Sequence, residues 1–153
     1  MRVLVAVLVS GALMLSAPGQ SSGSNACTAD ATKALIQSFV RGYGAGHVRA
    51  IDRMFAPAPR FVWFSAGPPM SRYGAPSHVR STLARYFRAR IRKHERIRIT
   101  ELGAGYDPKR RIVNFGGELV RAADDIRPRR VPTPFKGAAD CVTGRPSFIV
   151  WSM

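Results

Sequence analysis

The chain has 153 residues, enough for one ordinary domain and little more. Its 24 Lys and Arg outnumber its 9 Asp and Glu, and the resulting formal net charge of +15 favours anionic partners without specifying one. The two Cys and three His have no zinc-ligand spacing, and the sequence contains neither a G-x-S-x-G elbow nor a phosphate-binding loop. These observations argue against a zinc enzyme, an α/β-hydrolase and a P-loop nucleotide-binding protein.

The N-terminus resembles a secretory signal. Arg2 precedes an apolar run that is too short to cross a bilayer comfortably as a helix, and small and polar residues follow it. We therefore expect residues 1–26 to be a signal peptide with a short linker, cleaved after Gly19 or after Ala26. Residues 27–153 would then form a single exported domain, either secreted or retained in the periplasm or cell envelope.

Export would determine the chemistry of the two cysteines. In an oxidising compartment Cys27 and Cys141 can persist as a disulfide, and only one pairing exists. The alternative is a pair of buried thiols that do not meet. A lipoprotein anchored at Cys27 is another interpretation. Ser24 argues against it, because a leucine-like residue is expected at that position.

Two helices are predicted at the start of the domain. Thr28 or Asp30 can cap the first helix, and Gly42 begins the glycine-rich segment that ends it. The apolar side chains of this helix recur at helical spacing at Leu35, Ile36, Phe39, Val40 and Tyr43. A second, shorter helix ends before Pro57 and carries Val48, Ile51 and Phe55 on one side.

A strand at residues 60–65 follows, and its large apolar side chains point to both faces. One face must therefore meet helices, and the other must meet more protein or a ligand. Pro76 suits the first position of a third helix, whose apolar positions are Val79, Leu83, Phe87 and Ile91. Another face of this helix, expected to be exposed to solvent, carries Arg85, Arg88 and Arg92.

From Ile97 the hydrophobic period changes to two, which predicts strands. A turn at Asp107 and Pro108 should return the chain antiparallel along residues 111–122, and Gly116 and Gly117 indicate a bulge or bend there. The proline-rich residues 123–134 are expected to form an exposed loop, and two last strands are predicted at 135–142 and 147–151. This order predicts an α+β fold with helices on one face of a bent, mainly antiparallel sheet.

The stretch "LIQSFVRGYGAGHVRAIDRMFA" resembles the opening of the nuclear transport factor 2-like superfamily, in which a long helix ends in an Ala-Gly-Asp-like turn. Here that turn is Ala45, Gly46 and His47. The closing "FKGAADC" and "FIVWSM" are similar to the final strands of SnoaL-like members. The resemblance covers residues 28–153 and implies a cone-shaped fold, with three N-terminal helices packed on a strongly curved sheet around an apolar pocket.

The resemblance implies a small hydrophobic molecule as partner. We expect no cofactor, and the spacing of the Cys and His residues gives no metal site. The expected pocket residues are Phe39, Tyr43, Trp63, Phe87 and Asp140. We expect no specific nucleic acid and no membrane contact beyond the export signal. The interpretation also allows a homodimer formed through the sheet.

Enzymes of this superfamily include ketosteroid isomerases, polyketide cyclases and limonene epoxide hydrolases. In the isomerases a Tyr on the first helix polarises a carbonyl and an Asp near the first strand moves the proton. Those positions fall on Phe39 and Trp63, which have no hydroxyl and no base, so the isomerase mechanism is not expected. A shift of one helical turn in the alignment would bring Tyr43 to the pocket instead.

Other polar residues are weaker candidates for catalysis. Asp140 alternates with Cys141 in a predicted strand, so Asp140 points into the cone if Cys141 pairs outward. Glu118 beside the glycine pair is a similar candidate. His78 at the start of the third helix could lie at the pocket mouth or cap the helix, and Asp52 is expected to pair at the surface with its helix neighbours Arg49 and Arg53.

Three hypotheses follow from these residues. The leading one is an exported binding domain for a small hydrophobic molecule, without established catalysis. The second is an isomerase, cyclase or hydrolase that uses a pocket carboxylate. The third is a basic protein that binds anionic surfaces through its arginine-rich third helix.

Overall fold

The computed structural model describes residues 27–64, 79–141 and 144–153, with the backbone alone described at Trp63 and Phe64. The elements follow the predicted order. They are helices α1 (Ala29–Gly44) and α2 (Val48–Asp52), strand β1 (Val62–Phe64), helix α3 (Arg80–Arg92), and strands β2 (Arg96–Asp107), β3 (Ile112–Ala122), β4 (Val131–Asp140) and β5 (Ser147–Ser152). The α+β class predicted from the sequence is confirmed.

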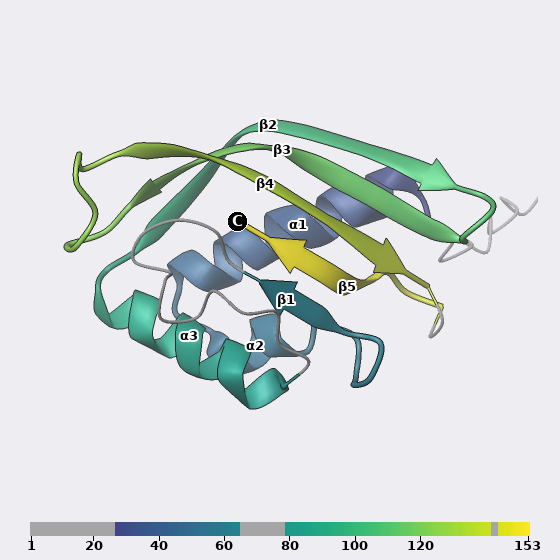
Figure 1. Cartoon of the computed structure of the whole chain (residues 1–153), viewed down its shortest axis with the longest axis horizontal. Coiled ribbons are helices and arrows are strands. Elements are labelled where there is room, and N and C mark those ends of the chain that lie inside the picture. The colour runs from purple at the N-terminus through teal and green to yellow at the C-terminus, as the bar shows by residue number, and fades with distance from the viewer. Residues whose placement is uncertain (1–26, 65–78, 142–143) are drawn as a thin grey trace, which may run out of the picture.

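The described strands form one sheet in the order β1-β5-β4-β3-β2. Strand β1 runs parallel to β5, and the other neighbouring strands are antiparallel. The sheet is strongly curved. Helix α1 runs along its concave side, and α2 and α3 lie on the same side, farther from β2 and β3 (Figure 1). This arrangement is the predicted cone of three helices against a bent sheet.

The β2–β3 pair has a register irregularity close to a glycine. The register shifts between Ile99 and Glu101, close to Gly117 on the opposite strand. A Cβ atom at Gly117 would lie only 2.0 Å from the Glu101 carbonyl oxygen, so a larger residue could not occupy this position without moving the backbone. The irregularity therefore lies close to the predicted glycine pair, but its extra residue, Thr100, belongs to β2 and not to the strand that carries the glycines.

The core lies between α1 and the concave face of the sheet. Thr28 caps α1, since its Oγ1 accepts a hydrogen bond from the Ala31 backbone N–H at 3.0 Å. Phe39 of α1 contacts Trp151 and Phe87, with ring centroids 4.5 and 5.6 Å apart. Further buried rings of the same cluster are Phe55, Phe115, Phe135 and Phe148. Burial of these aromatic surfaces stabilises the packing of α1 against the sheet.

The loop predicted at residues 123–134 is wrong for its last four residues, since residues 131–134 form the start of β4. Pairing between β4 and β5 begins only at Lys136, so Pro132 and Pro134 have a neighbouring strand on one side alone. A proline, which lacks a backbone N–H, is tolerated on an unpaired edge of a strand. The prolines therefore did not end the strand as the sequence suggested.

Helix α3 also differs from the prediction. It starts at Arg80, after Val79, which is 56% exposed, and Ile91 is only half-buried. The side chains that it buries are instead Leu83, Tyr86, Phe87 and Arg90. The predicted solvent-exposed face is confirmed at Arg85, Arg88 and Arg92, while Pro76 and His78 lie outside the described residues.

The predicted disulfide between Cys27 and Cys141 is confirmed, with the two Cα atoms 5.4 Å apart. Cys27 lies two residues before α1 and Cys141 directly follows β4, so the disulfide ties the start of the first helix to the sheet. In the part of the chain that the structure describes, no helix is long and apolar enough to cross a membrane.

Candidate binding site

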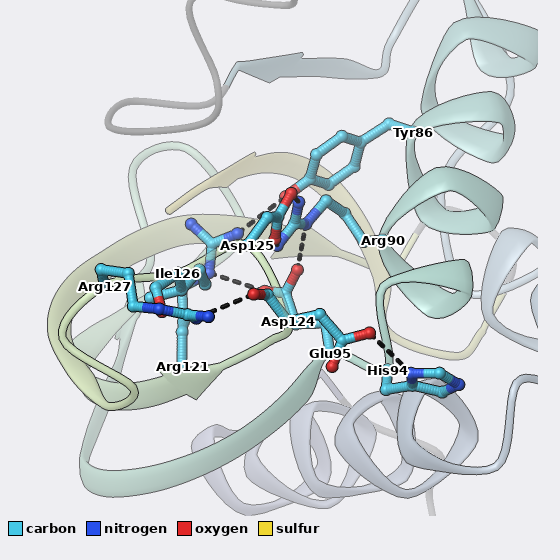
Figure 2. Close-up of polar contacts among 9 residues, drawn as sticks. All are labelled: Tyr86, Arg90, His94, Glu95, Arg121, Asp124, Asp125, Ile126 and Arg127. Atoms are coloured by element: carbon cyan, nitrogen blue, oxygen red, sulfur yellow. Dashed lines mark hydrogen bonds and ion pairs between the residues drawn. The ribbon is translucent and has the colours of Figure 1, made fainter.

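A buried ion-pair network occupies the end of the cone where α3 meets the sheet (Figure 2). Arg90 of α3, Glu95 after that helix and Arg121 of β3 are each no more than 3% exposed. Both arginines bind the Glu95 carboxylate: Arg90 Nε donates to Oε2, and Arg121 Nε donates to Oε1 at 2.7 Å. Arg121 also donates to the Tyr86 hydroxyl at 3.3 Å. We call these residues, with Asp125, the Glu95 network.

Asp125 balances the charge of the Glu95 network. It accepts two hydrogen bonds from the Arg90 guanidinium, at 2.8 and 2.9 Å, in a bidentate arrangement. This bonding to Arg90 lowers the pKa of the Asp125 carboxyl below its ordinary value of 3.8. Two arginines therefore face two carboxylates. This balance matters because a buried charge without a partner is strongly destabilising.

The turn after α3 directs Glu95 into the interior. His94 has a φ of 52°, in the left-handed region that residues other than glycine seldom adopt. The Glu95 backbone N–H donates to the Arg90 carbonyl at 3.2 Å, so the chain reverses beneath the helix. His94 Nδ1 lies 2.8 Å from Asp124 Oδ2, and the Asp124 N–H donates to the Lys93 carbonyl at 3.0 Å. The β3–β4 connection therefore holds this turn in place.

Tyr43 of α1 lies beside the Glu95 network. Its side chain is buried, and its hydroxyl has no hydrogen-bond partner among the described residues. Burial, and after it the nearby charge of Glu95, raises the pKa of Tyr43 well above the ordinary value of 10.0. Burial likewise raises the pKa of Tyr86. Both hydroxyls are therefore neutral at physiological pH and can donate a hydrogen bond.

Two other buried polar atoms, Thr32 Oγ1 and Trp151 Nε1, also lack a partner among the described residues. Thr32 and Tyr43 share the buried face of α1, and the Trp151 ring packs on Phe39 of the same face. Leaving a buried polar group without a partner costs about 1–3 kcal/mol. Three buried polar groups along the seam between α1 and the sheet are therefore without a hydrogen-bond partner among the described residues.

The structure brings three of the predicted pocket residues together. The ring centroids of Phe39 and Tyr43 are 5.8 Å apart, and the Phe87 ring lies 5.6 Å from each of them. For Trp63, the backbone pairs with Trp151 of β5, and its side chain lies outside the described residues.

The predicted acids lie elsewhere. Asp140 is buried, but it forms an ion pair with Arg60 and accepts from Ser147 Oγ at 3.4 Å. Asp140 pairs with Ile112 at the opposite end of β3 from Arg121, and it occupies the same side of β4 as the exposed Lys136. The structure therefore does not bring Asp140 to Tyr43.

Glu118 faces away from the core, since it alternates in β3 with the buried Leu119 and Arg121. Its carboxylate accepts from Thr100 Oγ1 at 3.2 Å on the exposed side of the sheet. Neither predicted acid therefore shares the interior with Tyr43.

The expected ion pair of Asp52 is confirmed, but its partner is Arg80 and not Arg49 or Arg53. Asp52 Oδ1 accepts from Arg80 Nε at 3.1 Å, and Arg80 also donates to the Phe55 and Ala56 carbonyls at 2.8 and 2.7 Å. The pair joins α2 to α3 because Arg80 lies on a neighbouring helix rather than one turn away on the same helix. Within the described ranges, no group of three His, Cys, Asp or Glu could hold a metal ion.

The sequence reasoning missed Arg90, Glu95 and Arg121. A signal for Arg90 exists, because it continues the series of Leu83, Tyr86 and Phe87 at the spacing of one helix face. Arg121 similarly continues the inward alternation of Leu119. Both were hidden by the many exposed arginines around them.

Neither a protein-family model nor a curated protein matches the sequence. Solved structures match in fold. An uncharacterised protein with a cystatin-like fold from Caulobacter vibrioides gives a TM-score of 0.65 at 17% identity, over 80% of this chain and 85% of that chain. An NTF2-like protein of unknown function from Pseudomonas putida gives 0.65 at 9% identity, over 81% and 83%.

An NTF2-like protein with a cystatin-like fold from Novosphingobium aromaticivorans gives a TM-score of 0.61 at 8% identity, over 80% of this chain and 78% of that chain. The chain therefore has the NTF2-like fold. The resemblance stated from the sequence is confirmed at the level of the fold.

Proposed function

We propose that the protein is an exported, SnoaL-like binding domain that holds a small, mainly apolar molecule inside its cone, without transforming it. The molecule would lie against the rings of Phe39 and Phe87, with Trp63 as a further lining residue. Its polar group would accept a hydrogen bond from Tyr43. Export rests on the signal-like N-terminus and on the Cys27–Cys141 disulfide, a bond that persists in oxidising compartments.

The unpartnered Tyr43 hydroxyl is the observation that carries this proposal. It is a neutral donor at one end of an aromatic interior, beside the Glu95 network, in which Glu95 and the Tyr86 hydroxyl both accept from Arg121. Binding sites for small molecules combine such apolar walls with a few placed polar groups. A carbonyl or hydroxyl of a ligand would remove the cost of leaving this group unbonded.

Binding is favoured over catalysis because the described residues place no free base beside Tyr43. Glu95 is a buried carboxylate near Tyr43, and each of its oxygens accepts from an arginine. An acid held this way stabilises two cations and is poorly suited to removing a proton from a substrate. The alternative, an isomerase, cyclase or hydrolase, would have to use Asp140 or Glu118 away from Tyr43.

The experiment compares two variants that each lose one hydroxyl, Tyr43→Phe and Tyr86→Phe. Binding is measured with prodan, a neutral fluorescent naphthalene ketone, and stability is measured by denaturant melts. Tyr43→Phe should weaken prodan binding by roughly tenfold, the value of one lost hydrogen bond, and leave stability unchanged or slightly higher.

Tyr86→Phe is the matched control, because its hydroxyl already accepts from the buried Arg121. This variant should lose about 1–2 kcal/mol of stability and keep its prodan affinity per folded molecule. The proposal fails if the wild-type protein does not bind prodan, or if Tyr43→Phe loses stability while binding is unchanged.

A further inference from the structure

A hollow of about 490 Å³ lies on the outer surface next to the Glu95 network. Its charged lining residues come from the turn after α3, the start of β2 and the β3–β4 connection. They are His94, Arg96, Asp124, Arg127, Arg129 and Arg130. We call this surface the Arg129 hollow. Its volume is within the range of sites for small ligands.

The connection that forms one wall is held firmly. Ile126 is buried, Asp125 is bonded to Arg90, and the Asp124 N–H donates to the Lys93 carbonyl. Arg127 Nη1 donates to the carbonyls of Asp124 and Ile126 at 2.8 and 2.9 Å (Figure 2). These hydrogen bonds hold the backbone from which Arg129 and Arg130 extend, so the two arginines lie on an ordered loop.

The hollow carries an excess of unneutralised positive charge. Four arginines line it against one carboxylate, Asp124, which is already paired with His94. Among the described residues, Arg129 and Arg130 make no ion pair or side-chain hydrogen bond, and both are exposed. Arg96 and Arg127 each donate hydrogen bonds to backbone carbonyls through Nη1 alone. Further N–H donors therefore remain on each guanidinium. Donors of this kind match the oxygens of a multivalent anion.

We propose that the Arg129 hollow binds a multivalent oxyanion of the phosphate type, carried by a free phosphorylated molecule or by a lipid headgroup. A ligand with a single carboxylate would neutralise only part of the positive charge of the hollow. A phosphate or pyrophosphate group carries more negative charge and can bridge two guanidinium groups. The site is separate from the interior between α1 and the sheet. Its occupation does not depend on the binding proposed there.

The test compares two double variants that remove equal charge. Arg129→Gln with Arg130→Gln alters the hollow, and Arg85→Gln with Arg145→Gln alters two exposed positions that do not line it. Exposed substitutions of this kind should leave folding nearly unchanged, which a thermal melt checks. Binding of inorganic pyrophosphate is measured by calorimetry at an ionic strength of about 0.15 M, where long-range attraction is screened. Flotation with vesicles containing phosphatidic acid tests the lipid source.

The hollow variant should lose roughly tenfold or more in affinity, and the control variant should stay within about twofold of the wild type. If the hollow variant loses pyrophosphate binding, the ligand is a free oxyanion. If the hollow variant loses only vesicle binding, the ligand is the lipid headgroup. Equal losses in both double variants would show a general charge effect and overturn the proposal. Absence of binding to both pyrophosphate and vesicles would also overturn it.

Discussion

Glu95 is the residue on which the buried charges depend, because Arg90 and Arg121 both bind its carboxylate inside the protein. We predict that Glu95→Gln lowers the free energy of unfolding by about 3 kcal/mol or more, since two buried guanidinium groups lose a shared anion while the side-chain volume is kept. Urea denaturation measures the change.

Glu101→Gln is the control for this substitution, because Glu101 is an exposed acid of β2 in the same charged protein. The control should change stability by no more than about 0.5 kcal/mol. If Glu95→Gln were as mild as the control, the Glu95 network would contribute little, and the positioning of α3 against β3 would have to rest on the aromatic core alone.

At the scale of elements, the disulfide joins the start of α1 to the end of β4. Replacing Cys27 and Cys141 by Ser should lower stability by about 2–4 kcal/mol, because closing so long a loop restricts the unfolded chain. Melting curves of the wild type with and without a reductant give the same comparison without a substitution. A reduced protein as stable as the oxidised one would contradict this prediction.

The elements also show how far the sequence could lead. Helical spacing identified α1, and alternation identified β2 and β3, because each has one apolar face against the core. The start of β4 escaped prediction, since Pro132 and Pro134 signal a loop unless the strand is known to lack a partner on one side. That information belongs to the register of the sheet and is not local to the segment.

Arg90 and Arg121 escaped prediction for a different reason. Their positions fit the buried faces of α3 and β3, but a buried arginine is plausible only when its anionic partners are known. Glu95 reaches them through a left-handed residue at His94, which no periodicity indicates. Sequence reasoning could therefore predict the cone and the aromatic contacts of Phe39, Tyr43 and Phe87, while the polar end of the interior required the structure.

The whole molecule is a disulfide-tied cone with an aromatic interior, the unpartnered Tyr43 hydroxyl beside the Glu95 network, and a strongly basic composition. The interior and the Arg129 hollow would serve different ligands. The first selects apolar character with one polar group, and the second selects negative charge.

A native mass spectrum of the protein, recovered from the medium or the cell-envelope fraction of cells that express the full chain, tests the central claim most directly. The account predicts a chain cleaved before Gln20 or Cys27, carrying a small molecule that denaturation releases and that Tyr43→Phe retains more weakly. The released molecule should be mainly apolar, with a carbonyl or hydroxyl group. A spectrum showing only the bare chain for the wild type, from protein that also fails to bind prodan, would contradict the claim that the cone holds a ligand.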